Sequence, residues 1–229
     1  MAFGNGPKIV TNGLTLCLDA SDRNSYPGSG TTWFDVSGNK NCALANSPAF
    51  DPTNGGSIAF DGADDYANIP GGQTAITLGN GDVAWTVSAW IKTTTAVNGL
   101  GQGSILSNSS SGPVFSMMGV NASKMVYWTY HSGWYQSLGT KTVNDNIWHM
   151  LTWVNYTNYT MDMYVDGVLD LNIANSTSGN NNPVDTIAGS WAGLYAGNLA
   201  TLSIYKGTAL TAAQVLQNYT VTKSRFNLK

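Results

Sequence analysis

The stretch from residue 144 to residue 173 constrains the fold more than any other part of this chain. Residues 147–154 alternate with a period of two, which is the side-chain period of a β-strand. Both faces are rich in large apolar residues, so we predict a strand that is buried, or nearly buried, on both sides. One face carries Trp148, Met150, Thr152 and Val154, and the other carries His149, Leu151 and Trp153.

A tight turn follows in the same stretch. The runs 161–165 and 168–171 are β-prone, and only Asp166 and Gly167 separate them. A type I′ hairpin turn needs positive φ at both central residues, and Asp-Gly is one of the pairs that adopt it most readily. The sequence therefore predicts three consecutive antiparallel strands with their register fixed by this turn.

The rest of the chain favours an all-β fold. All thirteen acidic residues are aspartate, so helix-favouring glutamate is missing, while Gly, Asn, Ser and Thr are abundant. Short alternating runs between polar turns have the spacing of a sandwich or jelly roll. We predict an extended N-terminal arm (residues 1–12) and one domain (residues 13–229). Further expected strands are 13–19, 42–44, 57–61, 66–69, 85–92, 103–107, 114–120, 125–130, 135–139 and 199–205.

One short helix is predicted near the C-terminus. Thr211 and Gln214 have the spacing of a capping box, in which each side chain satisfies an exposed backbone donor of the other residue. The helix should run from about residue 212 to residue 219 and bury Val215, Leu216 and Tyr219.

The charge distribution and hydropathy of the chain argue against nucleic-acid binding and membrane insertion. The ten basic residues are scattered except near the C-terminus, which argues against a nucleic-acid partner. No apolar run is long enough to span a bilayer and no signal peptide follows Met1, so we expect synthesis in a cytoplasm without membrane insertion. Cys17 falls in an alternating strand, where a thiol acts as a small hydrophobic group; its pairing with Cys42 is left open.

Several ordered segments resemble the LamG-like members of the concanavalin A-like lectin/glucanase superfamily. The resemblance implies a two-sheet antiparallel jelly-roll sandwich with a short C-terminal helix, and it covers nearly the whole chain. The segments are GLTLCLDA (13–20), GGSIAFDGADDYANI (55–69), WTVSAWIK (85–92), the Trp148-His149 pair, YVDGV (164–168) and LSIYKGTALTAAQVLQNY (202–219).

A narrower resemblance points to virion structural proteins of tailed bacteriophages, including those of cyanobacterial hosts. It lies in SYPGSGTTW (25–33) together with the FDG, DDY and C-terminal QNY segments. It implies a non-enzymatic protein, displayed on a virion as a capsid decoration, neck, tail or fibre component, that contacts other virion proteins and forms a homo-oligomer. The alternative is a lectin-like adhesion module that binds host surface glycans.

Enzyme activity is disfavoured by the aspartate-only composition. The glucanases of this superfamily carry a Glu-x-Asp-x-Glu strand, and a retaining mechanism needs two carboxyl groups about 5 Å apart. Without glutamate this motif is absent, and no aspartates recur at alternate positions of one strand.

Calcium is the one cofactor that the resemblance suggests, because many relatives hold it at the rim of the sandwich. Asp61, Asp64 and Asp65 could supply oxygen ligands. The competing interpretation is a hairpin turn in which Asp61-Gly62 sets the bend and the other two aspartates are solvated.

Two groups of residues are candidates for recognition or for scaffold roles. Tyr130, His131, Trp134 and Tyr135 form the most aromatic loop, which would bind a glycan or a protein partner, or else cover a sheet edge. We interpret His149 as a residue that orients its neighbours through a hydrogen bond inside the sandwich.

Overall fold

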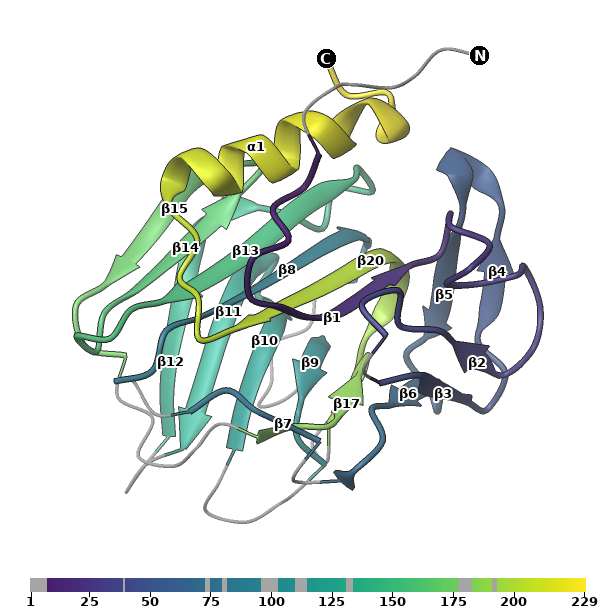
Figure 1. Ribbon diagram of the computed structural model, residues 1–229, viewed down its shortest axis with the longest axis horizontal. Coiled ribbons are helices and arrows are strands. Elements are labelled where there is room, and N and C mark those ends of the chain that lie inside the picture. The colour runs from purple at the N-terminus through teal and green to yellow at the C-terminus, as the bar shows by residue number, and fades with distance from the viewer. Residues whose placement is uncertain are drawn as a thin grey trace.

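The computed structural model describes residues 8–38, 40–72, 75–79, 82–95, 103–109, 115–130, 134–176, 183–190 and 193–229. Two antiparallel sheets pack face to face, and one α-helix, α1 (Ala212–Thr222), lies over one of them (Figure 1). This arrangement confirms the predicted all-β jelly-roll sandwich with a short C-terminal helix. No helix in the described part of the chain has the length and hydropathy that crossing a bilayer requires.

Sheet A is the sheet next to the helix. It consists of β1 (Leu14–Asp19), β4 (Ala49–Asp51), β5 (Ser57–Asp61), β8 (Trp85–Lys92), β13 (His149–Asn155), β14 (Met161–Val165), β15 (Val168–Ile173) and β20 (Ala196–Lys206). The strand order is β15-β14-β13-β8-β20-β5-β4, with β1 also paired to β20. Strands β13, β14 and β15 are consecutive antiparallel neighbours, as the sequence predicts.

Sheet B forms the opposite layer. It consists of β2 (Thr32–Trp33), β3 (Cys42–Ala45), β6 (Tyr66–Asn68), β9 (Ser104–Ser107), β10 (Phe115–Asn121), β11 (Lys124–Tyr130), β12 (Trp134–Thr142) and β17 (Thr186–Ile187). The order is β12-β11-β10-β9-β17-β6-β3-β2. Two small ribbons complete the described β structure: β7 (Ile76–Thr77) with β16 (Pro183–Val184), and β18 (Gly189–Ser190) with β19 (Gly193–Leu194).

Strands β8 and β13 are buried on both faces. Their inward residues, such as Leu151 and Trp153, belong to the core between the sheets. Their outward residues, such as Trp90 and Met150, belong to a second core between sheet A and the C-terminal segment, which also contains Val215. The period-two prediction for this region is therefore confirmed.

Helix α1 begins at the predicted capping box, in which Gln214 N–H donates to Thr211 Oγ1 at 3.3 Å. Val215 is buried as predicted, but the prediction for Leu216 is wrong, because its side chain is 48% exposed. One residue along a helix turns the side chain by about 100°, which places Leu216 beside the turn between β14 and β15 at the edge of sheet A and not over the buried strands. Phe226, in the short 3₁₀ segment Lys223–Phe226, fills the second core and stacks on Trp90.

The backbone of Val10 is held at both of its polar groups. Its N–H donates to Asn218 Oδ1 at 2.8 Å, and its carbonyl accepts from the Tyr205 hydroxyl at 2.9 Å. Asn218 Nδ2 donates to the same hydroxyl at 3.1 Å, and Gln217 Nε2 donates to the Lys8 carbonyl at 2.7 Å. Residues 8–10 therefore run against helix α1, whereas the division into an arm of residues 1–12 and a domain of residues 13–229 stays a prediction.

The turn between β14 and β15 has the predicted geometry, with φ of 56° at Asp166 and 76° at Gly167. Asp166 also ties the turn to β13, because Oδ1 accepts from Met150 N–H at 2.9 Å and Oδ2 lies 2.8 Å from His149 Nδ1. The other ring nitrogen of His149 lies 3.2 Å from Asp145 Oδ1. The orienting role predicted for His149 thus acts at this turn and not inside the sandwich.

The surroundings of His149 favour the imidazolium form. A carboxylate can only accept hydrogen bonds. Both ring nitrogens must therefore carry a hydrogen if His149 is to bond Asp166 and Asp145 at the same time. Burial of the ring lowers its pKa, but the hydrogen bonds and charges of Asp166 and Asp145 outweigh this effect. The pKa of His149 is therefore raised above its ordinary value.

Both cysteines are free and buried. Burial raises the pKa of the Cys17 thiol to about 11 and that of the Cys42 thiol to about 12. Both thiols are therefore protonated near neutral pH and pack as small hydrophobic groups, as the sequence predicts for Cys17.

Gly167→Val should destabilise the protein, because it places a β-branched residue at positive φ and its Cβ would lie 3.1 Å from Leu216 Cδ1. We expect the free energy of unfolding in urea to fall by roughly 2–4 kcal/mol. Gly207→Val is the matched control: φ is 73°, but no heavy atom lies within 4 Å of the added Cβ. Gly207→Val should lower the free energy of unfolding by less than Gly167→Val does. Near-normal stability of Gly167→Val would refute the role assigned to the turn.

A second prediction concerns pH. Because the pKa of His149 is higher in the folded protein than in the unfolded chain, its stabilising contribution is complete below the unfolded pKa of about 6.5. The contribution is lost as the pH rises through the folded pKa. Urea unfolding between about pH 5.5 and about pH 8.5 should show a decline in stability that is smaller in His149→Gln. The other histidine, His131, is present in both proteins, so equal declines would contradict the prediction.

Candidate functional site

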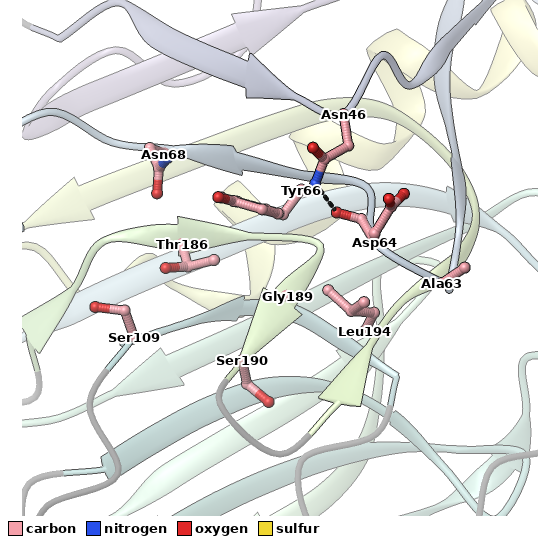
Figure 2. Close-up of a pocket in the computed structure, with 10 residues that line it drawn as sticks. All are labelled: Asn46, Ala63, Asp64, Tyr66, Asn68, Ser109, Thr186, Gly189, Ser190 and Leu194. Carbon is pink, nitrogen blue, oxygen red and sulfur yellow. Dashed lines mark hydrogen bonds between the residues drawn. The ribbon is translucent and has the colours of Figure 1, made fainter.

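An open groove of about 440 Å³ lies on the outer face of sheet B (Figure 2). Strands β6 and β17 pair with each other beneath the groove, and the β18–β19 ribbon lies beside them. Ala67 points into the core between the sheets, so the alternation of β6 turns its two neighbours outward. The lining residues are Asn46, Ala63, Asp64, Tyr66, Asn68, Ser109, Thr186, Gly189, Ser190 and Leu194.

Tyr66 supplies the aromatic surface of the groove. Its ring lies between Asn46 on one side and Thr186 and Gly189 on the other (Figure 2). Gly189 makes this close arrangement possible, since a Cβ at that position would lie 3.2 Å from Tyr66 Cβ and 3.1 Å from Leu194 Cδ2. The groove therefore combines an aromatic ring with nearby polar groups, which is typical of ligand sites.

A buried carboxylate fixes the hydroxyl groups of Ser109 and Thr186, which form the polar floor of the groove. Asp185 is 3% exposed, and its Oδ1 accepts from Ser109 N–H at 2.7 Å and from Thr186 Oγ1 at 2.8 Å. Its Oδ2 accepts from Ser109 Oγ at 2.7 Å. The backbone of Asp185 bonds Ile69 N–H and Ser107 carbonyl, which fixes its position between β6 and β9. Two groove hydroxyls are thus held in place from beneath.

Asn46 closes one end of the groove. It has φ of 62°, a conformation that asparagine tolerates better than most residues, and its Nδ2 donates to the Asp64 carbonyl at 2.7 Å (Figure 2). This bond links the loop after β3 to the turn after β5. The end wall is therefore held by a cross-link between two segments distant in sequence.

The aspartates predicted as calcium ligands lie together at this turn. One carboxylate oxygen from each of Asp61, Asp64 and Asp65 falls within 4.8 Å of the others. The predicted hairpin is wrong, because β5 belongs to sheet A and β6 to sheet B, so the turn connects the two layers. Asp65 is only 6% exposed, which also contradicts the expectation that it is solvated.

Their surroundings differ in a way that the pKa values reflect. The backbone N–H of Ala63, which donates to Asp61 at 2.8 Å, holds the pKa of Asp61 below its usual value. Burial raises the pKa of Asp65, and the charges of Asp61 and Asp64 raise it further. The three carboxylates would supply only part of the six to eight oxygens that calcium prefers, and calcium binding at this turn stays a prediction.

The aromatic loop predicted for recognition is only partly described. His131 lies outside the described residues, and for Tyr130 and Trp134 the structure gives the backbone, which pairs across β11 and β12. Tyr135 is described and is 53% exposed. Strands β11, β10 and β9 lie between β12 and the groove strand β17, so Tyr135 is not brought to the groove. A binding role for this loop stays a prediction.

Sequence reasoning found only Asp64 among the groove residues. Tyr66 and Asn68 carry a usable signal, because polar and aromatic residues alternate there with the buried Ala67. Ser109 and Thr186 carry no such signal, since they approach β6 only through the strand order of sheet B.

Comparisons with known proteins agree with this fold. The sequence pattern described as the concanavalin A-like lectin/glucanases superfamily matches residues 61–216, more than half of the chain. No curated protein matches the chain by sequence. Several solved structures share the fold at low sequence identity.

One of these structures is domain 4 of AbnA, an extracellular arabinanase from Geobacillus stearothermophilus, in complex with arabinotriose. It is 18% identical to this chain with a TM-score of 0.66, and the match covers 90% of this chain and 98% of that chain. Botulinum neurotoxin type C, which interacts with two ganglioside molecules, is 14% identical with a TM-score of 0.67, over 91% of this chain. Trypanosoma rangeli sialidase, solved with the inhibitor DANA, is 14% identical with a TM-score of 0.66, over 96% of this chain.

This chain spans 51% of the neurotoxin chain and 34% of the sialidase chain. At such identities the likeness shows the fold alone. The match of the superfamily pattern over most of both sheets shows the family. The chain therefore belongs to the concanavalin A-like lectin/glucanases superfamily.

Proposed function

We propose that this protein is a carbohydrate-binding module and that the groove beside Tyr66 holds the glycan. The observation that carries the proposal is the combination of an aromatic ring with amide and hydroxyl groups in one open groove of about 440 Å³. A sugar has an apolar C–H face and a rim of hydroxyl groups. Tyr66 can pack against the face, while Asn46, Asn68 and Ser109 can bond the rim.

The fold neighbours support this proposal over the virion role that the sequence favours. A domain with this fold was solved with arabinotriose, and another protein with it interacts with gangliosides. These ligands belong to those proteins, and the arabinotriose complex supports the proposal because 98% of that domain is covered by the match. The lectin-like alternative is therefore the preferred function, with a host surface glycan as the proposed partner.

Binding without cleavage is part of the proposal. Glycoside hydrolysis by carboxylates needs two such groups flanking the scissile bond, and Asp64 is the sole carboxylate among the ten lining residues of the groove. The chain also has no glutamate, so the glucanase motif of the superfamily cannot be present.

A virion location is a further proposal for where such a module would act. The side chains of Val168 and Leu169 in β15 and of Leu216 in α1 are 54%, 49% and 48% exposed. Exposed large apolar side chains are available for protein contacts. They support, as the second candidate, a structural protein of a bacteriophage particle, made in the host cytoplasm and assembled with other virion proteins or with copies of itself.

Tyr66→Ala should weaken glycan binding about tenfold or more, because it removes the aromatic face of the groove. A glycan array would identify ligands of the wild-type protein, and titration calorimetry would measure the variant. Tyr135→Ala is the matched control, since it removes an exposed tyrosine outside the groove.

Trp134→Ala tests the aromatic loop separately. Loss of binding in Trp134→Ala with retention in Tyr66→Ala would place the site at residues 130–135 and refute the groove. Thermal unfolding of each variant would show that the fold is retained.

Oligosaccharides that bind should be recovered intact after long incubation at neutral pH, because Asp64 is the sole carboxylate among the described residues that line the groove. Mass spectrometry of the recovered sugars measures this directly. Release of shorter products that stops in Asp64→Asn would show that the protein is an enzyme.

A further inference from the structure

The hydroxyl groups on the floor of the groove have a fixed orientation. Each of the Ser109 and Thr186 hydroxyls lies within hydrogen-bond distance of an oxygen of the buried Asp185 carboxylate. Both hydroxyls donate their single hydrogen to this carboxylate, so they keep only lone pairs for a ligand. The floor therefore presents acceptors, which suit the O–H donors of a sugar.

The charge of the groove has one sign. Asp64 is one of the ten lining residues, none of which is lysine or arginine, and the carboxylates of Asp61 and Asp65 lie within 4.8 Å of its own. The donors that the lining offers are neutral: the amides of Asn46 and Asn68 and the phenol of Tyr66. A ligand carboxylate would therefore find negative charge without a cationic partner.

The repulsion between Asp64 and a carboxylate on the ligand should be large enough to measure. Two negative charges about 6 Å apart weaken binding by about threefold in water and by about a hundredfold where the effective dielectric constant is about 20. Acceptor-only hydroxyls on the floor add to this effect, because a ligand carboxylate cannot donate to them.

We infer that the groove selects neutral, hydroxyl-rich glycans and rejects glycans that carry a carboxylate, such as sialylated ones. This inference rests on the proposed function, because it assigns the class of glycan that the same groove binds. Asp64 sets the charge selectivity from the end wall of the groove, while Asp185 acts as a positioning residue for the two hydroxyls.

The test compares two oligosaccharides that differ only by a terminal sialic acid, chosen from the neutral glycans that bind the wild-type protein on an array. By titration calorimetry, the wild-type protein should bind the neutral sugar at least about threefold more tightly than its sialylated counterpart. Added salt should reduce this ratio, because it screens the charge of Asp64.

Two variants locate the effect. Asp64→Asn should lower the ratio of neutral to sialylated affinity toward unity. Asp82→Asn removes the same charge from a residue that does not line the groove, and it should leave the ratio unchanged. Equal or tighter binding of the sialylated sugar, or an unchanged ratio in Asp64→Asn, would overturn the inference and leave the proposed function standing. Failure to bind any glycan would overturn the proposed function itself.

Discussion

Burial of strands β8 and β13 on both faces is the constraint on which the rest of the structure depends. Each strand carries large apolar side chains inward and outward, as with Trp153 and Met150 of β13. A sheet with two apolar faces is stable only when both are covered. Sheet B covers one face, and helix α1 with the segment ending in Phe226 covers the other, so one pair of strands determines a three-layer arrangement.

Features that depend on neighbouring residues could be predicted from the sequence. The strands follow from their period of two, the turn at Asp166-Gly167 from its φ requirement, and the helix start from Thr211 and Gln214. The exposure of Leu216 cannot be predicted in this way, because an apolar residue in an amphipathic helix does not reveal which neighbours its face meets. At Asp61-Gly62 turn chemistry shows that the chain bends, and only strand pairing shows that β5 and β6 lie in different sheets.

The groove depends on contacts that no local pattern encodes. It combines the turn between the sheets, strands β6 and β17 of sheet B, Ser109 beyond β9 and a small ribbon, and these segments meet only in the folded protein. Asp185 makes the arrangement specific, because a buried carboxylate must be paired and its partners are two groove hydroxyls and a backbone N–H. The groove is therefore largely preformed, which reduces the entropy lost when a weakly interacting ligand such as a sugar binds.

The hydrogen bonds around Val10 have a consequence for how the protein can be displayed. They hold residues 8–10 against helix α1, on the outer face of sheet A, and the chain also runs through its last helical segments there (Figure 1). Tyr66 and Asn68 point outward from sheet B, on the opposite side of the sandwich. Attachment of a larger assembly through either of these chain segments would leave the groove facing away from the attachment point and open to the medium.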